Sequence, residues 1–196
     1  YSESIRRELL DIADRHNVPM IADEIYQDVV FDGPVAPIGS LNPEAPVISL
    51  SGLSKGYLAP GWRTGWLVAG GGDRLKDVLA AITKLAEGRL CSTVPMQRAI
   101  VPALTGDRSH QARFRTALRE RADLVFQRAN AIPGVTSTKP VAAFYAMPKV
   151  ELPKGRTDED YVLALLRKTG VLCVHGSGFG TPASQGTRAE RNELGK

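Results

Sequence analysis

Charged residues follow two apolar segments in the first third of the chain, and their types suit one kind of chemistry. Asp23 follows the first segment, the pair Ser54 and Lys55 follows the second, and Arg63 comes eight residues after the lysine. In open α/β sheets, ligands bind beyond the carboxyl ends of the strands. A lysine there can form a Schiff base, a carboxylate can pair with a protonated ring nitrogen, and an arginine can bind a phosphate. The alternative is that Asp23 caps a turn and that the two basic residues are solvated loop charges.

The predicted secondary structure places these residues at one edge of a sheet. Apolar periodicity predicts a helix over residues 4–16, and buried strands are predicted over residues 18–22, 47–50 and 66–69. Strands and helices in this order favour an α/β layer with a mainly parallel sheet. The ends of the strands would then bring the acid, the lysine and the arginine to the same rim.

Residues after the third strand are predicted to form helices first and short strands later. These further elements are expected to be helices at 73–87 and 96–104, a long helix that ends near 131, strands within 135–152, a helix capped by Thr157 and a strand from Val171 to Val174. The change of pattern indicates two domains, an α/β part over residues 1–106 and a smaller α+β part over residues 107–196.

Composition and charge are those of an ordinary globular chain. The 196 residues are 43% hydrophobic and 23% charged, with a net charge of +4, which excludes collagen and disulfide-rich mini-proteins. No apolar run is long enough to span a bilayer, and no signal peptide follows Tyr1, so a cytoplasmic protein without a membrane partner is expected. The arginines between residues 108 and 128 are interpreted as a solvated helix face, because no nucleic-acid-binding module is recognised. Cys91 and Cys173 have no metal-ligand spacing and are expected to be buried.

Two motifs, in the expected order, resemble those of a known enzyme family. Residues 51–66 (SGLSKGYLAPGWRTGW) resemble the lysine motif of class I pyridoxal-phosphate aminotransferases, and residues 21–26 (IADEIY) are similar to the strand-end motif that precedes it there. Residues 142–145 (AAFY) also fit and would line the pocket, so the resemblance runs from about residue 3 to residue 180. It implies fold type I, with residues 1–106 as the C-terminal part of the large cofactor-binding domain and residues 107–196 as the small C-terminal domain.

The resemblance also implies a role for five residues. Lys55 would hold pyridoxal 5'-phosphate covalently and move the proton of the substrate. Asp23 would keep the nitrogen of the cofactor ring protonated, and Tyr26 would hydrogen-bond the 3-oxygen of that ring. Arg63, helped by Ser54, would bind the phosphate group.

Departures from the family pattern bear on whether the chain is active. Gly52 stands where the family often has serine, so one phosphate contact is expected to be missing. Family members are about twice as long, and they carry a glycine-rich phosphate loop, an aromatic that stacks on the ring and an asparagine ahead of the region that Tyr1 matches. Arg188 does not lead into an apolar strand, so the arginine that binds the substrate carboxylate is left unassigned. The chain is therefore interpreted as a C-terminal fragment.

The implied activity is transfer of an amino group between an amino acid and a 2-oxo acid. The GLSK and GWRTGW sequences look closest to the alanine (glutamate–pyruvate) transaminase branch, so alanine with 2-oxoglutarate is the expected pair. Aspartate or an aromatic amino acid is the alternative donor. The family works as homodimers, and no metal is expected.

Two further interpretations stay open. The first is an inactive fragment that has lost part of the cofactor site. The second is a serine hydrolase, because the sequence around Ser54 also reads G-x-S-x-G, with Asp158, Asp160 and His175 downstream. A nucleophile of that kind must be followed directly by a helix, and Pro60 would interrupt it.

Overall fold

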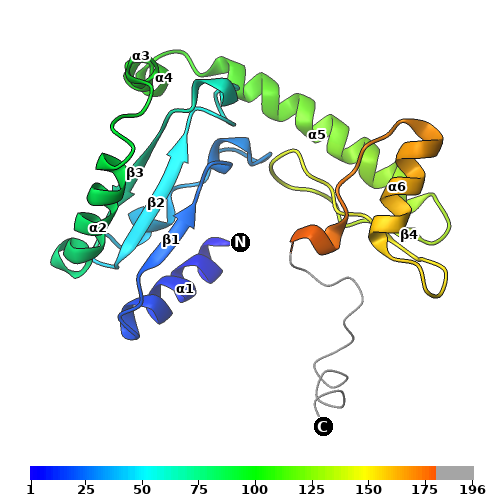
Figure 1. The fold of residues 1–196 in the computed structure, drawn as a ribbon, viewed down its shortest axis with the longest axis horizontal. Helices are drawn as coiled ribbons and strands as arrows, with labels where there is room; N and C mark the ends of the chain where they lie inside the picture. Colours follow the sequence, from blue (N-terminus) through cyan, green and yellow to red (C-terminus); the bar gives the residue numbers. More distant parts are fainter. Residues whose placement is uncertain (180–196) are drawn as a thin grey trace, which may run out of the picture. The chain divides into compact units, whose positions relative to one another are not determined.

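The computed structural model describes residues 1–179, so Arg188 lies outside the described residues. It divides into two compact units, one made of residues 1–124 and 140–145, the other of residues 125–139 and 146 onward. The elements in chain order are α1 (Glu3–Arg15), β1 (Met20–Asp23), β2 (Val47–Gly52), β3 (Gly65–Ala69), α2 (Lys76–Glu87), α3 (Val94–Gln97), α4 (Ile100–Thr105), α5 (Ser109–Asn130), β4 (Val135–Thr136), β5 (Lys149–Val150) and α6 (Asp158–Thr169) (Figure 1). None of the helices in this described part has the length and apolar character needed to cross a bilayer. The predicted domain boundary after residue 106 stays a prediction.

The first unit is built on a mixed three-stranded sheet in the order β1-β2-β3 (Figure 1). β1 and β2 are parallel, with Ile21 opposite Ile48, as expected. β3 runs antiparallel to β2, which differs from the expectation of a mainly parallel sheet. The connection between them explains the difference: it contains only a short 3-10 helix, Pro60–Trp62. A parallel connection needs about a dozen residues or more, usually with a helix that crosses the sheet.

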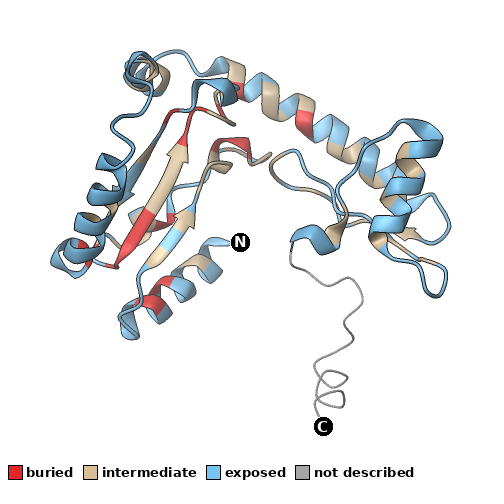
Figure 2. Ribbon diagram, viewed as in Figure 1, coloured by how far each residue is buried: buried red, intermediate tan, exposed pale blue. Residues whose placement is uncertain are grey.

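The core of the first unit lies between α1 and the sheet. Leu10 of α1 is buried and packs with Ile38, Ala45 and Val47. Figure 2 shows buried residues along β2 and the segment that leads into it. The edge strand β1 is less well covered, and Ile21 is 69% exposed. The best-packed strand is therefore β2, the one that leads to Lys55.

The second unit pairs a short hairpin with a capped helix. Val135 of β4 lies opposite Val150 of β5 in an antiparallel pair, as the prediction of short strands requires. α6 begins with a capping box, in which Thr157 accepts a hydrogen bond from the backbone of Asp160 and the Asp160 side chain accepts one from the backbone of Thr157. The helix ends at Gly170 in the left-handed conformation, φ 74°. The predicted Thr157 cap is confirmed.

Three predictions of regular or buried structure are wrong. Residues 171–174 form no strand, because within the described residues β4 and β5 pair only with each other. Cys91 and Cys173 are exposed rather than buried, since both lie on irregular segments. The helix expected over 96–104 is divided into α3 and α4. Pro102 has no N–H to donate to the preceding turn, which favours this break.

The arginines of α5 do not form a purely solvated face. Arg115 Nη1 donates to the carbonyl oxygen of Asp28 at 3.1 Å. Arg119 Nη2 donates to the carbonyl oxygen of Phe31 at 2.5 Å and pairs with the carboxylate of Asp32 at 2.6 Å. Backbone carbonyls and a carboxylate of the segment after β1 thus attract these cations. The prediction of a solvated face therefore holds for Arg119, which is 46% exposed, and not for Arg115, which is half-buried.

Candidate active site

Asp23 and Lys55 follow the carboxyl ends of neighbouring parallel strands. Asp23 is the last residue of β1 and lies opposite Leu50 of β2. β2 ends two residues after Leu50, and the chain then continues to Lys55. The Asp23 side chain is exposed, and its Oδ1 accepts a hydrogen bond from the backbone N–H of Ile25 at 3.2 Å. That contact is the turn cap that the alternative interpretation expects. It uses one carboxylate oxygen, so Oδ2 is a further acceptor at this edge of the sheet.

The amine of Lys55 lies against two aromatic rings. Its Nζ is 5.9 Å from the ring centroid of Tyr26 and 5.6 Å from that of Phe144. The two rings meet edge to face, with centroids 5.4 Å apart. A cation is attracted to the face of an aromatic ring within about 6 Å. The structure therefore brings together Lys55 and Tyr26, and it adds Phe144 from a distant part of the chain.

The hydroxyl of Tyr26 is paired with a second phenol. It lies 2.5 Å from the hydroxyl of Tyr145, and the two ring centroids are 5.6 Å apart. Burial, the hydrogen bond with Tyr145 and the negative charge of Asp23 raise the pKa of Tyr26 to about 12. Tyr26 therefore keeps its proton at neutral pH and can serve as a hydrogen-bond donor.

The connection that carries Lys55 is tied to the sheet at both ends. The backbone N–H of Leu53 donates to the carbonyl of Thr64 at 3.1 Å, and that of Ala59 donates to the carbonyl of Leu53 at 3.1 Å. A Cβ added to Gly52 would lie 2.8 Å from the Thr64 carbonyl oxygen and 2.9 Å from the Cα of Gly65. This close approach explains why glycine, and not the serine of the family pattern, occupies position 52.

In the described residues, Arg63 makes no hydrogen bond or ion pair with Lys55. Arg63 has a left-handed backbone, φ 53°, and its Nη1 donates to the carbonyl of Pro60 at 2.8 Å within the same connection. Ser54 is half-buried. Within residues 1–179, no hydrogen bond or ion pair links Arg63 to Ser54 or to Lys55. The phosphate-binding role of Arg63 and Ser54 stays a prediction.

The surroundings of Ser54 do not form the nucleophile turn of a hydrolase. The segment after Ser54 contains turns and a 3-10 helix and then enters β3, with no α-helix. His175 Nδ1 lies 2.9 Å from the hydroxyl of Ser177, which donates to Asp158 Oδ1 at 2.9 Å. All three belong to the second unit, whereas Ser54 belongs to the first. The remaining candidate, Asp160, caps α6.

An ion pair beside the lysine connection was not predicted. Arg108 Nη2 lies 2.6 Å from Oδ1 of Asp28, which is buried. A Cβ on Gly56 would lie 2.8 Å from the Cβ of Asp28, so the backbone next to Lys55 rests directly on this carboxylate side chain. The guanidinium of Arg108 also lies 5.6 Å from the ring centroid of Tyr57. The two partners are 80 residues apart, and no local pattern in the sequence indicates their pairing.

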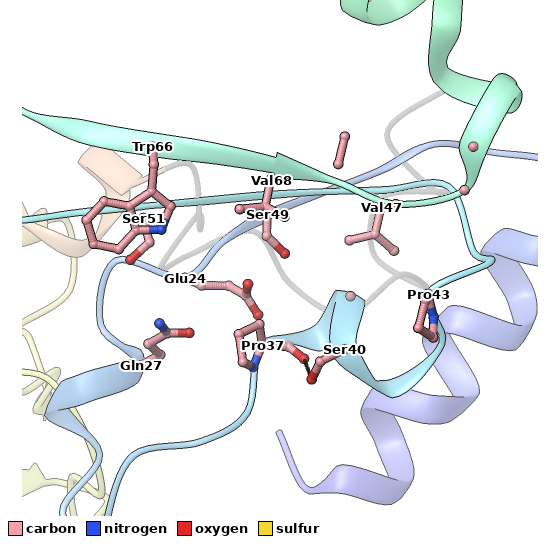
Figure 3. A pocket seen from close by; sticks show the side chains of 15 residues that line it. Glu24, Gln27, Pro37, Ser40, Pro43, Val47, Ser49, Ser51, Trp66 and Val68 are labelled. Atoms are coloured by element: carbon pink, nitrogen blue, oxygen red, sulfur yellow. Dashed lines mark hydrogen bonds between the residues drawn. The ribbon is translucent and has the colours of Figure 1, made fainter. Parts of the chain in front are cut away.

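A cavity of about 530 Å³ lies on the β2–β3 face and contains none of the five predicted site residues. Figure 3 shows side chains of β2 and β3 on one side and the loop that carries Pro37 and Ser40 on the other. Glu24 lines it, but its Oε1 accepts a hydrogen bond from the backbone of Ile38 at 2.6 Å. The cavity offers no amine, and the described residues contain no cluster that could bind a metal. The candidate active site is therefore the group around Lys55.

The fold and this group of side chains agree with one class of protein. Residues 3–189 match the family model of aminotransferase class I and II, and the chain belongs to this family. The predicted family and the predicted fold type I are thereby confirmed. Enzymes of this family depend in general on pyridoxal phosphate.

Individual relatives narrow the comparison. The glutamate-pyruvate aminotransferase AlaA of Haemophilus influenzae is 38% identical over 185 residues, which cover 91% of this chain and 46% of the relative. The solved alanine aminotransferase from Pyrococcus furiosus is 41% identical with a TM-score of 0.86, over 92% of this chain and 46% of that one. The aspartate aminotransferase from Rhizobium meliloti is 30% identical with a TM-score of 0.77, and the match covers 98% of this chain and 52% of that one. The chain thus spans about half the length of these relatives.

Proposed function

We propose that this chain supplies the lysine-bearing part of an aminotransferase that moves an amino group between alanine and 2-oxoglutarate. Pyridoxal 5'-phosphate is its cofactor. The observation that carries the proposal is the amine of Lys55 held against Tyr26 and Phe144, at the sheet edge where β1 ends in Asp23. The names of the Haemophilus and Pyrococcus relatives support alanine and pyruvate as the substrate class.

The side chains present fit this cofactor. An amine that can hold an aldehyde carbon, a phenol that keeps its proton and a carboxylate with a remaining acceptor oxygen occur together at Lys55, Tyr26 and Asp23. Arg63 uses Nη1 on its own connection, so its Nε and Nη2 are the donors for a phosphate, with Ser54 as a further donor. When bound, the cofactor supplies an electron-withdrawing ring next to the substrate Cα.

The chain's own residues then have separate tasks. Lys55 would hold the cofactor through Nζ, and the same atom, as a free amine, would take and return the proton of the substrate Cα. Asp23 accepts the hydrogen bond of the protonated ring nitrogen and balances its charge. Tyr26 donates its phenolic proton to the ring oxygen. The two half-reactions would follow a ping-pong sequence: the loaded enzyme would keep the amino group and release the first 2-oxo acid, and would then give the amino group to the second 2-oxo acid.

Covalent capture of the cofactor tests the proposal. The purified chain is mixed with pyridoxal phosphate and reduced with borohydride, and mass spectrometry locates the modified lysine. We expect modification at Lys55 that is lost in Lys55→Ala and kept in Lys84→Ala, a matched change on α2. Modification spread evenly over surface lysines would contradict the assignment of Lys55. Alanine, aspartate and an aromatic amino acid are then compared as donors to 2-oxoglutarate.

An inactive fragment is the second candidate, because the chain spans only 46% of its Haemophilus relative. The same experiment distinguishes it: specific capture at Lys55 without turnover of any donor indicates a cofactor-binding but inactive chain. The homodimer and the cytoplasmic location stay predictions, and sedimentation of the purified chain with and without cofactor tests the former.

A further inference from the structure

The contact between Tyr26 and Tyr145 joins two hydroxyl groups that are 119 residues apart in the sequence and 2.5 Å apart in space. Each phenol can donate one hydrogen bond and accept others, so one of the two must accept here and keeps its own proton for another partner. Three charged or polar groups face Tyr26: Tyr145, the carboxylate of Asp23 and the amine of Lys55. The carboxylate and Tyr145 both favour the protonated phenol at Tyr26.

Backbone contacts hold Tyr145 in this position. Residues 29–31 pair with residues 141–143: the N–H of Ala143 donates to the carbonyl of Val29 at 2.9 Å, and the N–H of Phe31 donates to that of Val141 at 3.0 Å. Ala143 itself has φ 59°, a left-handed conformation that is uncommon for a residue with a Cβ. Such a backbone persists only where the surroundings determine it, and such positions gather at functional sites. The turn at Ala143 directly precedes the two aromatic residues that reach Tyr26.

Packing alone does not explain the phenol pair. Tyr145 is 54% exposed, so water could satisfy its hydroxyl without any contact to Tyr26. Instead its hydroxyl contacts that of Tyr26, and its ring contacts that of Phe144 with centroids 5.0 Å apart. Ordering an exposed side chain in this way opposes folding, which points to a role at the site rather than in stability.

We propose that Tyr145 is a positioning residue for Tyr26. In the cofactor-free chain Tyr26 donates to Tyr145, and with the cofactor bound Tyr145 donates instead to Tyr26, so that the proton of Tyr26 points toward the cofactor. This inference rests on the proposed function. Tyr145 touches Tyr26 and not the reacting atoms. Removing its hydroxyl leaves the proton of Tyr26 free to rotate, and cofactor affinity should fall about fivefold, the factor expected for one neutral hydrogen bond.

The first test needs no cofactor. Ultraviolet absorbance follows the ionisation of the tyrosines in the parent chain and in the variants Tyr145→Phe and Tyr26→Phe. Tyr161→Phe, on α6, is the matched control. We expect one tyrosine of the parent chain to ionise near pH 12, to be missing in Tyr26→Phe and to ionise at lower pH in Tyr145→Phe. An unchanged titration of Tyr26 in Tyr145→Phe would overturn the proposal.

The second test uses the chain with pyridoxal phosphate bound, and it measures a spectroscopic property that general destabilisation of the fold does not change. The pH at which the Lys55-bound cofactor changes colour is measured in the same variants. Tyr145→Phe should shift this pH in the same direction as Tyr26→Phe and by less, while Tyr161→Phe leaves it unchanged. A shift in Tyr26→Phe with none in Tyr145→Phe overturns the inference alone. Absence of any Lys55-dependent colour in the parent chain overturns the proposed function, and the inference with it, even where the first titration detects the phenol pair.

Discussion

Replacing Arg108 with methionine should lower the free energy of unfolding by about 2 kcal/mol. An exposed ion pair contributes about 0–1 kcal/mol, whereas removing one partner of a buried pair costs about 3–5 kcal/mol because it leaves a charge without a partner. Asp28 is 9% exposed, but the side chain of Arg108 is 39% exposed, so solvent reaches the pair from the arginine side. The expected loss therefore lies between the two limits.

Urea denaturation of four proteins measures this effect: the parent chain, Arg108→Met, Asp28→Asn and the double variant. The matched control is Arg119→Met, which removes a pair with the same 2.6 Å separation but with a partner, Asp32, that is 88% exposed. We expect a loss below about 1 kcal/mol for the control. We also expect the double variant to lose less than the sum of the two single losses. Equal losses in Arg108→Met and Arg119→Met, or full additivity, would refute the reasoning.

Three more predictions concern single positions. Gly56→Ala should destabilise the chain by about 1–3 kcal/mol and weaken cofactor capture, because its Cβ would lie 2.8 Å from the Cβ of Asp28; equal denaturation midpoints would contradict this. Ala143→Gly should keep or raise stability by up to about 1 kcal/mol, because glycine adopts φ 59° freely, and a clear loss in urea would show that the Cβ matters more than the backbone. Hydrogen bonds from Ser177 lower the pKa of Asp158, so their stabilising effect is present at pH above the unfolded value of 3.8 and is lost as the pH falls through the lower folded value. The protection of the Ser177 amide, measured as its exchange rate relative to the intrinsic rate at each pH, should fall over that acidic range, and Asp158→Asn should remove this pH dependence.

Short apolar segments of the sequence predicted the parts of the site that lie at the ends of single strands. Apolar runs that end in Asp23 and before Lys55 indicated two strands with a common edge, and the parallel pair of β1 and β2 confirms it. The direction of β3 depends on what the connection after Gly52 can form, and a short Pro-Gly segment gives no crossing helix. The geometry shows proximity for Lys55 and Tyr26, and the roles of the five site residues stay predictions.

Most features that sequence reasoning missed depend on contacts between distant segments; the break between α3 and α4 at Pro102 is a local exception. Asp28 looks like any surface acid after a strand, and its burial appears only when Arg108 comes to lie beside it. Apolar residues 171–174 satisfy a strand pattern, but a strand also requires a partner with free backbone groups. The burial expected for Cys173 fails for the same reason, since this segment packs into no sheet.

The close approach of Gly52 and Gly65 limits which amino acid replacements these two positions of the hairpin can accept. Every amino acid replacement that one nucleotide change can produce in a glycine codon introduces a Cβ, and at Gly65 that atom would lie 2.5 Å from the carbonyl oxygen of Ser51. Gly61, within the same connection, has no atom within 4 Å of an added Cβ. Substitution of glycine is therefore tolerated at Gly61 and restricted at Gly52, Gly56 and Gly65. The two ends of the connection and Gly56 beside Asp28 keep their place, so the position of Lys55 relative to the sheet is preserved while the residues around Gly61 diverge.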